Sequence, residues 1–180
     1  NKILIRNKIL APKLISENYK EDFIEIQDFG KDTIYKLLKK YPMNKINLYR
    51  KSIDLLNKIQ KIRNFKSKNF KGKIYKIPNY DHDKLYSEAK LFTDWYTKKF
   101  VSKKVLKKLN LSIHQQIKFL LSNLKFKKKV FVHRDFHVSN LMKHKNQLAI
   151  IDSQDAVIGN RAYDLASLID DVRFISNNKL

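Results

Sequence analysis

Three polar side chains in the last third of the chain could share one metal-dependent reaction. Asp135 closely follows the apolar run at residues 130–132, and Asp152 directly follows the run at 148–151. Short runs of β-branched residues bounded by polar ones are typical of buried strands, so each carboxylate is expected at the carboxyl end of a strand. Asn140 lies in the loop between the two runs. Carboxylate and amide oxygens are hard ligands that suit Mg²⁺, and we expect Asn140 and Asp152 to hold it.

The spacing of these residues matches a known catalytic loop. His133-Arg134-Asp135, with Asn140 five positions on, fits the pattern H-R-D-x-x-x-x-N, in which the Asp takes the proton of an attacking hydroxyl and the Asn holds a metal. Phosphoryl transfer needs both functions. The alternative is that His133 and Asp135 only satisfy buried backbone groups at a strand end. Placement between two strand-like runs favours the catalytic interpretation, because a motif counts only in its structural context.

Several segments together resemble the aminoglycoside phosphotransferase/choline kinase superfamily. They are residues 133–140, I-D-S-Q-D-A at 151–156, Gly159 and Y-D-L-A-S-L at 163–168. The chain most resembles the branch of bacterial sugar kinases that phosphorylate the anomeric hydroxyl of N-acetylmuramate and N-acetylglucosamine in cell-wall recycling. Three features favour that branch. Arg134 stands where many aminoglycoside enzymes carry Gly, and residues 88–96 (E-A-K-L-F-T-D-W-Y) resemble its E-x-x-L-F-x-D-W-Y. Residues 153–156 (S-Q-D-A) resemble its F-Q-D-A, although Ser153 replaces the Phe or Trp expected there.

The resemblance implies an α+β, protein-kinase-like fold with ATP and Mg²⁺ as cofactors. Residues 1–30 would be the remnant of a small lobe with the hinge, and residues 31–180 a mostly helical large lobe. Backbone groups near Ile26, Gln27 and Asp28 would meet the adenine. From the residues alone, that segment could equally be an ordinary hairpin that ends at Gly30.

The resemblance also distributes roles among the polar residues. Asp135 would orient and deprotonate the acceptor hydroxyl, with Asn140 and Asp152 on the metal. His133 would hold the loop by hydrogen bonding, and Arg134 would position either the loop or an anionic group.

The remaining candidates support the site or meet the acceptor. Asp164 would brace the loop through hydrogen bonds. Contacts with the acceptor are expected from His137, Asp155 and Glu88. For Glu88 and its helix, solvated charges are an equally good explanation.

The charge balance is strongly basic, with 39 Lys and Arg against 17 Asp and Glu and a formal net charge of +22. Such a balance can indicate nucleic acid, an anionic membrane surface or anionic substrates. The lysines are scattered along the sequence, so we favour a compositional origin and do not expect a nucleic-acid partner. The chain has no cysteine and no apolar stretch long enough to span a membrane. We expect a cytoplasmic protein without membrane partners.

Two parts of a kinase small lobe are not found in the sequence. The three glycines, Gly30, Gly72 and Gly159, form no G-x-G-x-x-G loop, and no V-A-I-K-like strand precedes the first helix. Both parts grip the phosphates in kinases. We therefore expect a chain truncated at both ends, which alone binds nucleotide weakly and transfers little phosphate.

Helices and loops must position these residues. Residues 60–83 lack periodicity and are predicted to be a long loop. Apolar residues at helical spacing from Leu85 to Phe100 predict an amphipathic helix that buries Phe92 and Tyr96. A capping box at Ser112 predicts the start of another helix, and Asp170-Asp171 is expected to face solvent.

Three functions remain open from the sequence. The first is an ATP-dependent phosphotransferase that moves the γ-phosphate to a hydroxyl of a small molecule, with the anomeric hydroxyl of an N-acetylated amino sugar favoured. The second is the same chemistry on an aminoglycoside or choline. The third is a catalytically incomplete kinase-like module, or a basic nucleic-acid-binding module.

Overall fold

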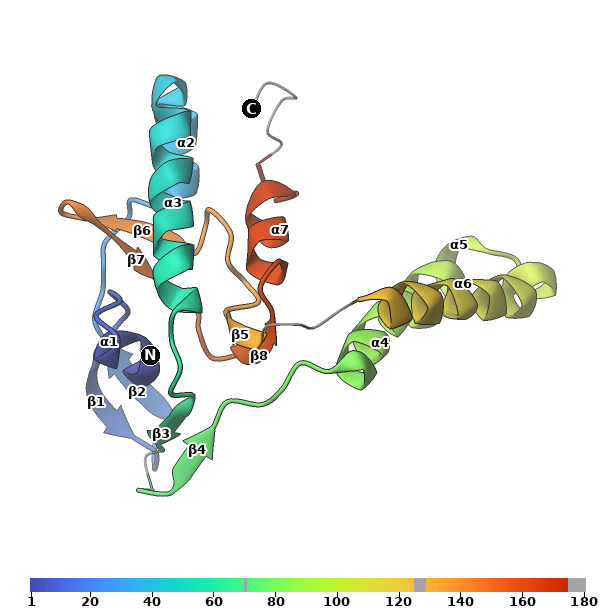
Figure 1. Cartoon of the computed structure of the whole chain (residues 1–180), viewed down its shortest axis with the longest axis horizontal. Helices are drawn as coiled ribbons and strands as arrows, with labels where there is room; N and C mark the ends of the chain where they lie inside the picture. The colour runs from blue at the N-terminus through green and yellow to red at the C-terminus, as the bar shows by residue number, and fades with distance from the viewer. Residues whose placement is uncertain (70, 125–128, 175–180) are drawn as a thin grey trace. The chain divides into compact units, whose positions relative to one another are not determined.

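A computed structural model describes residues 1–69, 71–124 and 129–174. The chain divides into two compact units (Figure 1). The first unit combines Asn1–Pro78 with Lys129–Leu180, and the second is Asn79–Lys128. The small lobe was predicted to end at residue 30, and residues on both sides of that boundary lie in the first unit. The division into a small and a large lobe stays a prediction.

Helices of the first unit pack around one apolar cluster. The longest, α3, buries residues at intervals of three and four positions, which places them on one face of the helix. Together with α2 and α7 it covers side chains from the strands, including Phe131, Leu141 and Ile150. Each fully buried side chain of this size contributes about 1.5–3 kcal/mol. The helical elements are α1 (Lys2–Arg6), α2 (Ile34–Lys40), the 3₁₀ turn η1 (Pro42–Asn44), α3 (Lys45–Gln60) and α7 (Tyr163–Ile169).

The strands of the described residues form antiparallel pairs. The strands predicted beside the two polar loops are present as β5 and β7, and their partners β8 and β6 were not predicted. Half of β6 is polar (Lys143 and His144), and in β8 the apolar pair Val157-Ile158 is followed by Gly159, a residue that weakens a strand pattern. The pairs are β1 (Leu14–Asn18) with β2 (Phe23–Ile26), β3 (Lys66–Lys68) with β4 (Ile74–Lys76), β5 (Lys129–Val132) with β8 (Val157–Asn160), and β6 (Leu141–His144) with β7 (Gln147–Ile150).

The β6–β7 hairpin places the end of one polar loop next to the start of another. Strand β6 begins immediately after Asn140, and β7 ends two residues before Asp152. The Ile151 N–H donates to the Asn140 carbonyl at 3.1 Å. This bond continues the hairpin and brings the two loops together at one end of it.

The segment at residues 60–83 differs from its prediction as a long loop. It contains the β3–β4 hairpin, with Lys66 opposite Lys76. These strands have only three residues each, and most of their side chains are exposed. Lysines at the pairing positions hide the alternation that would predict a strand.

The second unit is a pair of helices without a glycine or proline to interrupt them. The helix predicted to begin at Ser112 begins nine residues earlier, because the capping box lies inside a continuous helical segment. No described helix in the protein combines the length and the apolar character that a membrane crossing requires. The elements are α4 (His82–Leu91), the π-helical turn η2 (Phe92–Thr97), α5 (Lys98–Phe100) and α6 (Lys103–Asn123).

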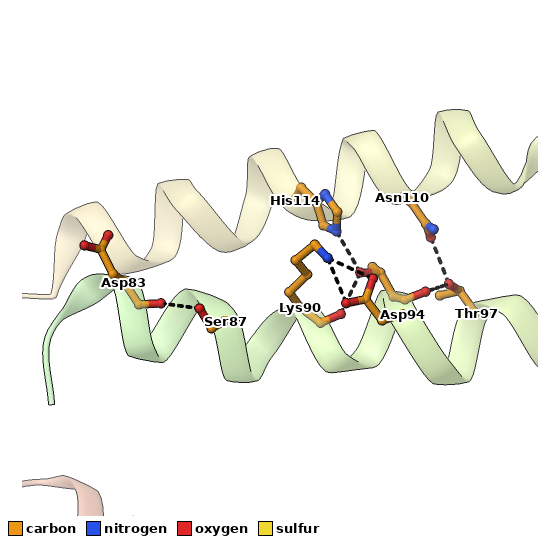
Figure 2. Close-up of polar contacts among 8 residues, drawn as sticks. Asp83, Ser87, Lys90, Asp94, Thr97, Asn110 and His114 are labelled. Carbon is orange, nitrogen blue, oxygen red and sulfur yellow. Dashed lines mark hydrogen bonds and ion pairs between the residues drawn. The ribbon is translucent and has the colours of Figure 1, made fainter. Parts of the chain in front are cut away.

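Polar residues hold the helices of the second unit together (Figure 2). Thr93 and Thr97 are buried. The Thr93 hydroxyl donates to the Lys90 carbonyl, so the His114 Nε2–H is the donor across the 2.7 Å contact with Thr93 Oγ1. Thr97 Oγ1 lies 2.8 Å from two acceptors, the Thr93 carbonyl oxygen and Asn110 Oδ1, and donates its single proton to one of them at a time. Hydrogen bonds therefore join η2 to α6.

The apolar stripe predicted for this helix is not buried. Phe92 and Tyr96 are 50% and 54% exposed and stack on each other in the open, with ring centroids 5.1 Å apart. The π-helical turn accounts for the error, because its i→i+5 bonds add a residue per turn and change which face points inward. Thr93 and Thr97 take the inward positions.

Candidate active site

The loop at residues 133–140 begins with a strained backbone. Arg134 has φ +77°, in the left-handed region where residues other than glycine are uncommon. Asp152, in the neighbouring loop, has φ +67°. Such conformations persist only where the surroundings enforce them, and they concentrate at functional sites.

Asp164 supplies part of that enforcement. Its carboxylate accepts hydrogen bonds from the backbone N–H groups of His133, at 2.8 Å, and of Arg134, at 3.0 Å. The side chain is buried in the first turn of α7. Burial raises the pKa of Asp164 to about 6, although the two N–H donors oppose the shift. The carboxylate thus fixes the backbone at the two residues that precede Asp135.

His133 is fully buried beneath the loop. Burial lowers the pKa of its imidazole to about 4, while the carboxylates of Asp135 and Asp152 act in the opposite direction. The ring lies edge-on to Phe136, with centroids 6.4 Å apart. A neutral, enclosed imidazole at pH 7 can pack and position the loop, but it does not face an incoming substrate.

Hydrogen bonds connect the three residues predicted to do the chemistry. Asn140 Nδ2 donates to the Asp135 carbonyl at 3.1 Å, which closes the loop on itself. The Asn140 carbonyl in turn accepts from Ile151, the residue before Asp152. Asp135 is half-buried, and Asp152 is exposed. The sequence-distant Asp152 is therefore held beside the loop that carries Asp135.

The donor atoms fit a hard cation. Because the Asn140 amide nitrogen is bonded to the Asp135 carbonyl, its amide oxygen is the atom left to bind a metal. The Asp152 carboxylate accepts one bond from Gln154 at 2.7 Å and keeps a second oxygen. Among residues 1–69, 71–124 and 129–174, no group of three or more His, Cys, Asp or Glu could hold a metal. One amide and one carboxylate oxygen suit Mg²⁺, which retains waters and binds phosphates.

A hollow of about 600 Å³ connects these residues with the segment after β2. Asn140 and Asp152 line one part of it, and Gln27 and Asp28 line another. Apolar side chains provide further walls, with Ile24 and Ile26 coming from β2 and Met142 and Ile151 from the hairpin side. Strand pairing places Ile24 and Ile26 on one face of β2, so alternation in the sequence could have identified them.

The segment predicted as a hinge is indeed the end of a β-hairpin. The Gln27 N–H donates to the Lys13 carbonyl at 2.8 Å, which extends the β1–β2 pairing. Asp28 Oδ1 accepts from the Gly30 N–H, and Gly30 adopts φ +86°, a turn that favours glycine. Gln27 Oε1 is a buried atom without a hydrogen-bond partner among the described residues. The two interpretations of this segment are therefore compatible, since the hairpin end lines the hollow.

The candidate substrate residues do not share one place. His137 is buried, and its Nε2 lies 3.4 Å from Asn140 Nδ2. Asp155 is exposed, two residues beyond the Ser153 that lines the hollow. Glu88 lies in the second unit, where the Tyr80 hydroxyl donates to its carboxylate. The structure thus places His137 beside the candidate metal ligands and gives Glu88 a partner within its own unit.

Sequence reasoning missed a buried carboxylate behind this loop. Asp171 is 5% exposed, so the prediction that it faces solvent was wrong. Arg173 lies 3.4 Å from one of its oxygens, and the other oxygen has no partner among the described residues. Burial, and to a smaller extent the positive charge of the nearby Arg173, lowers the pKa of His137. The negative charge of Asp171 acts in the opposite direction. No local pattern marks Asp171 as buried, because it follows the end of α7.

Comparisons with known proteins show the family and the fold of this chain. The sequence pattern of the family described as "Phosphotransferase enzyme family" matches residues 10–178. The chain is 37% identical over 95 residues to an N-acetylmuramate/N-acetylglucosamine kinase of Neisseria meningitidis serogroup B, covering 53% of this chain and 28% of that protein. It is 27% identical over 166 residues to a kinase of the same name from Pseudomonas aeruginosa, covering 92% of this chain and 46% of that protein. The chain thus spans less than half the length of these relatives.

A solved structure supports the fold. The chain matches an ADP-bound aminoglycoside phosphotransferase with a TM-score of 0.62 and 18% identity, covering 96% of this chain and 58% of that one. The predicted α+β, protein-kinase-like fold is confirmed. The match of the family pattern over most of the chain completes the argument, and the chain belongs to the phosphotransferase enzyme family.

Proposed function

We propose that this chain forms the nucleotide- and metal-binding part of an ATP-dependent kinase that transfers the γ-phosphate to a hydroxyl of a small molecule. The observation that carries the proposal is the hollow of about 600 Å³ lined by both Gln27-Asp28 and the pair Asn140 and Asp152. Its apolar walls suit a base, and its oxygen ligands suit a phosphate-bound cation.

In this proposal the loop residues divide the chemistry. Asp135 orients the acceptor hydroxyl and takes its proton, a contribution of about 100- to 10,000-fold in rate. Asn140 and Asp152 hold Mg²⁺, which when bound neutralises charge on the phosphates. Asp164 keeps the backbone before Asp135 in its left-handed conformation through the hydrogen bonds to His133 and Arg134.

The acceptor we propose is the anomeric hydroxyl of an N-acetylated amino sugar, which would serve cell-wall recycling. Support comes from the names of the two curated relatives and from residues 88–96, which resemble that branch. The likeness to an aminoglycoside phosphotransferase supports the fold and not the acceptor, since only 18% of residues are identical.

The test is a phosphotransfer assay on the longest natural form of the protein that carries this chain. Mg²⁺ and ATP are supplied with N-acetylmuramate, N-acetylglucosamine, an aminoglycoside or choline in parallel. We expect phosphate on the two amino sugars. The methyl glycoside of N-acetylglucosamine is the matched control, because its anomeric oxygen has no proton to lose.

Each result of that screen decides one part of the proposal. Transfer to the methyl glycoside would exclude the anomeric hydroxyl, and transfer only to the aminoglycoside or choline would replace the acceptor class. If no acceptor is phosphorylated and Mg²⁺-ATP gives no thermal protection, the kinase itself is rejected in favour of a kinase-like module without catalysis.

A further inference from the structure

Two neighbouring hollows lie along α3, apart from the site described above (Figure 1 shows α3 and the β6–β7 hairpin). Their volumes are about 420 and 290 Å³. Lys51 and the hairpin residues 146–148 line both, so the two hollows lie next to each other along the helix, and we call them together the groove. None of their lining residues lines the hollow at Asn140 and Asp152.

The lining of this groove is basic. Asp54 is its only acidic residue, and it is also the only acidic residue in the sequence between Asp32 and Asp81. Within the part of the chain that the structure describes, no groove lysine is paired with a carboxylate. The lysines that line the groove, all exposed, are Lys8, Lys51, Lys58, Lys143 and Lys145.

These charges come from separate parts of the sequence. Asn47, Lys51 and Lys58 lie at intervals of four and seven residues, which places them along one stripe of α3. Lys143 and Lys145 come from the β6–β7 hairpin on the other side of the groove, where Lys145 occupies the turn with φ +55°. Tertiary structure therefore gathers lysines that the sequence shows only as scattered.

Amide side chains complete the groove. Asn44, Asn47, Asn146 and Gln147 can each donate a hydrogen bond to an oxygen atom. The stripe from Asn47 to Lys58 is about 16 Å long at 1.5 Å per helical residue. An extended chain of several phosphates can lie along a stripe of that length.

We propose that this groove binds a linear chain of phosphates, as presented by single-stranded nucleic acid or by inorganic polyphosphate. Unpaired lysines on both walls match a row of negative charges, and binding releases the counterions that such a chain condenses. The hollowed, elongated form fits a narrow chain, whereas a lipid bilayer would meet a flat surface. The proposal is independent of the acceptor and of catalysis.

The experiment measures fluorescence anisotropy of a labelled twelve-nucleotide poly-dT with the full chain at several salt concentrations. The probe should bind with a Kd on the order of 10 µM at low salt. The variant Lys51→Glu/Lys58→Glu reverses two charges on α3. Its affinity should fall at least tenfold, and the slope of log Kd against log salt should become shallower by about 1.4.

The matched control is Lys104→Glu/Lys108→Glu, which makes the same change in net charge on exposed positions of α6. It should lose less than threefold in affinity, and circular dichroism melting should show that both variants fold. Equal losses in the two variants would overturn the proposal, since they would show that binding follows net charge alone.

Competition experiments separate the sources of the phosphate chain. Displacement of poly-dT by inorganic polyphosphate would show that a row of phosphates is sufficient, and failure to displace would show that the bases contribute. Both results support binding in the groove, and they show which of the two ligands it prefers. Binding only to vesicles of anionic lipid, with none to poly-dT or polyphosphate, would overturn the proposal.

Discussion

The two units of the protein bury opposite kinds of side chain. In the first unit most of the buried residues are apolar, and the larger cluster that they form includes Leu4, Leu38 and Leu168. In the described part of the second unit, the buried residues are Tyr80, Thr93 and Thr97. Its aromatic and aliphatic side chains are largely exposed, and hydrogen bonds connect the helices (Figure 2).

The buried polar groups of the two units have different roles. Asp164 is buried, and its burial is compensated by two backbone donors that fix the loop before Asp135. In the second unit, the buried threonines connect η2 to α6 and order no loop. Changes in the first unit should therefore alter stability strongly or activity strongly, while changes in the second should alter stability mildly.

The largest effect is expected at Asp135. Asp135→Asn removes the proposed proton acceptor without altering the backbone carbonyl that Asn140 uses, so turnover should fall about 100- to 10,000-fold. Steady-state kinetics measure the loss, and an unchanged melting temperature confirms the fold. Near-normal turnover would remove Asp135 from the mechanism.

A matched pair of truncations tests the comparison directly. Leu38→Ala opens a cavity in the first unit and should lower the free energy of unfolding by about 2–5 kcal/mol. Leu120→Ala alters a side chain that is 63% exposed, and should stay within about 0.5 kcal/mol of wild type. Urea denaturation measures both. Similar losses would show that the face carrying Leu120 is buried in solution.

The buried imidazole predicts an acid-sensitive contribution in the first unit. The pKa of His133 is about 4 in the folded chain, below its ordinary value, so protonation favours the unfolded chain. The stability that depends on neutral His133 is complete above pH 6.5 and is lost as the pH falls toward 4. From pH 7 to 5, wild type should lose about 2 kcal/mol relative to His133→Gln.

Denaturation of both proteins at each pH measures this difference. Asp164 is present in both proteins. Because its pKa is raised, the folded chain binds a proton there more readily than the unfolded chain, and this contribution cancels when the two stability curves are compared. Parallel stability curves for wild type and His133→Gln would show that His133 is not enclosed.

Removal of a hydrogen bond in the second unit should lower the free energy of unfolding by less than the truncation of Leu38 does. Thr97→Val keeps the shape of the side chain but removes the donor to Asn110, and should cost about 0.5–1.5 kcal/mol. Thr97→Ser, which retains the hydroxyl, is the control. A neutral or stabilising Thr97→Val would show that apolar packing suffices between η2 and α6.

The smallest effect is expected at the surface ion pair of the second unit. Lys90 and Asp94 lie 2.8 Å apart, and their side chains are partly exposed, at 42% and 35%. Solvent screens such a pair, so Asp94→Asn should leave the melting temperature unchanged within error at physiological salt. A clear decrease would show that the second unit depends on charges as well as on its threonines.

Local patterns predicted the catalytic side of the first unit well. Apolar runs predicted β5 and β7, and H-R-D-x-x-x-x-N placed Asp135 and Asn140 in the loop after β5. These features could be read because a buried strand and the loop after it are encoded by adjacent residues. The hairpin that was one of the two explanations for the segment before Gly30 is present as β1–β2.

Elsewhere the local patterns were misleading. The capping box at Ser112 was wrong because a helix already ran through it, and the aromatic stripe from Phe92 was wrong because a π-helical turn rotated the inward face. The burial of Asp171 depends on neighbours distant in the sequence. Each error arises where the outcome depends on packing between segments.

The sequence by itself determined which residue types are available for the proposed phosphoryl transfer, and their order along the chain. Only the tertiary structure decided that Asp164 fixes the backbone of His133 and Arg134, and that lysines from α1–β1, α3 and the β6–β7 hairpin line one groove. The physical reason is that spacing along a chain encodes helices, strands and their loops. Hydrogen bonds between distant segments, and the gathering of their charged side chains on one surface, exist only after the apolar cluster has brought those segments together.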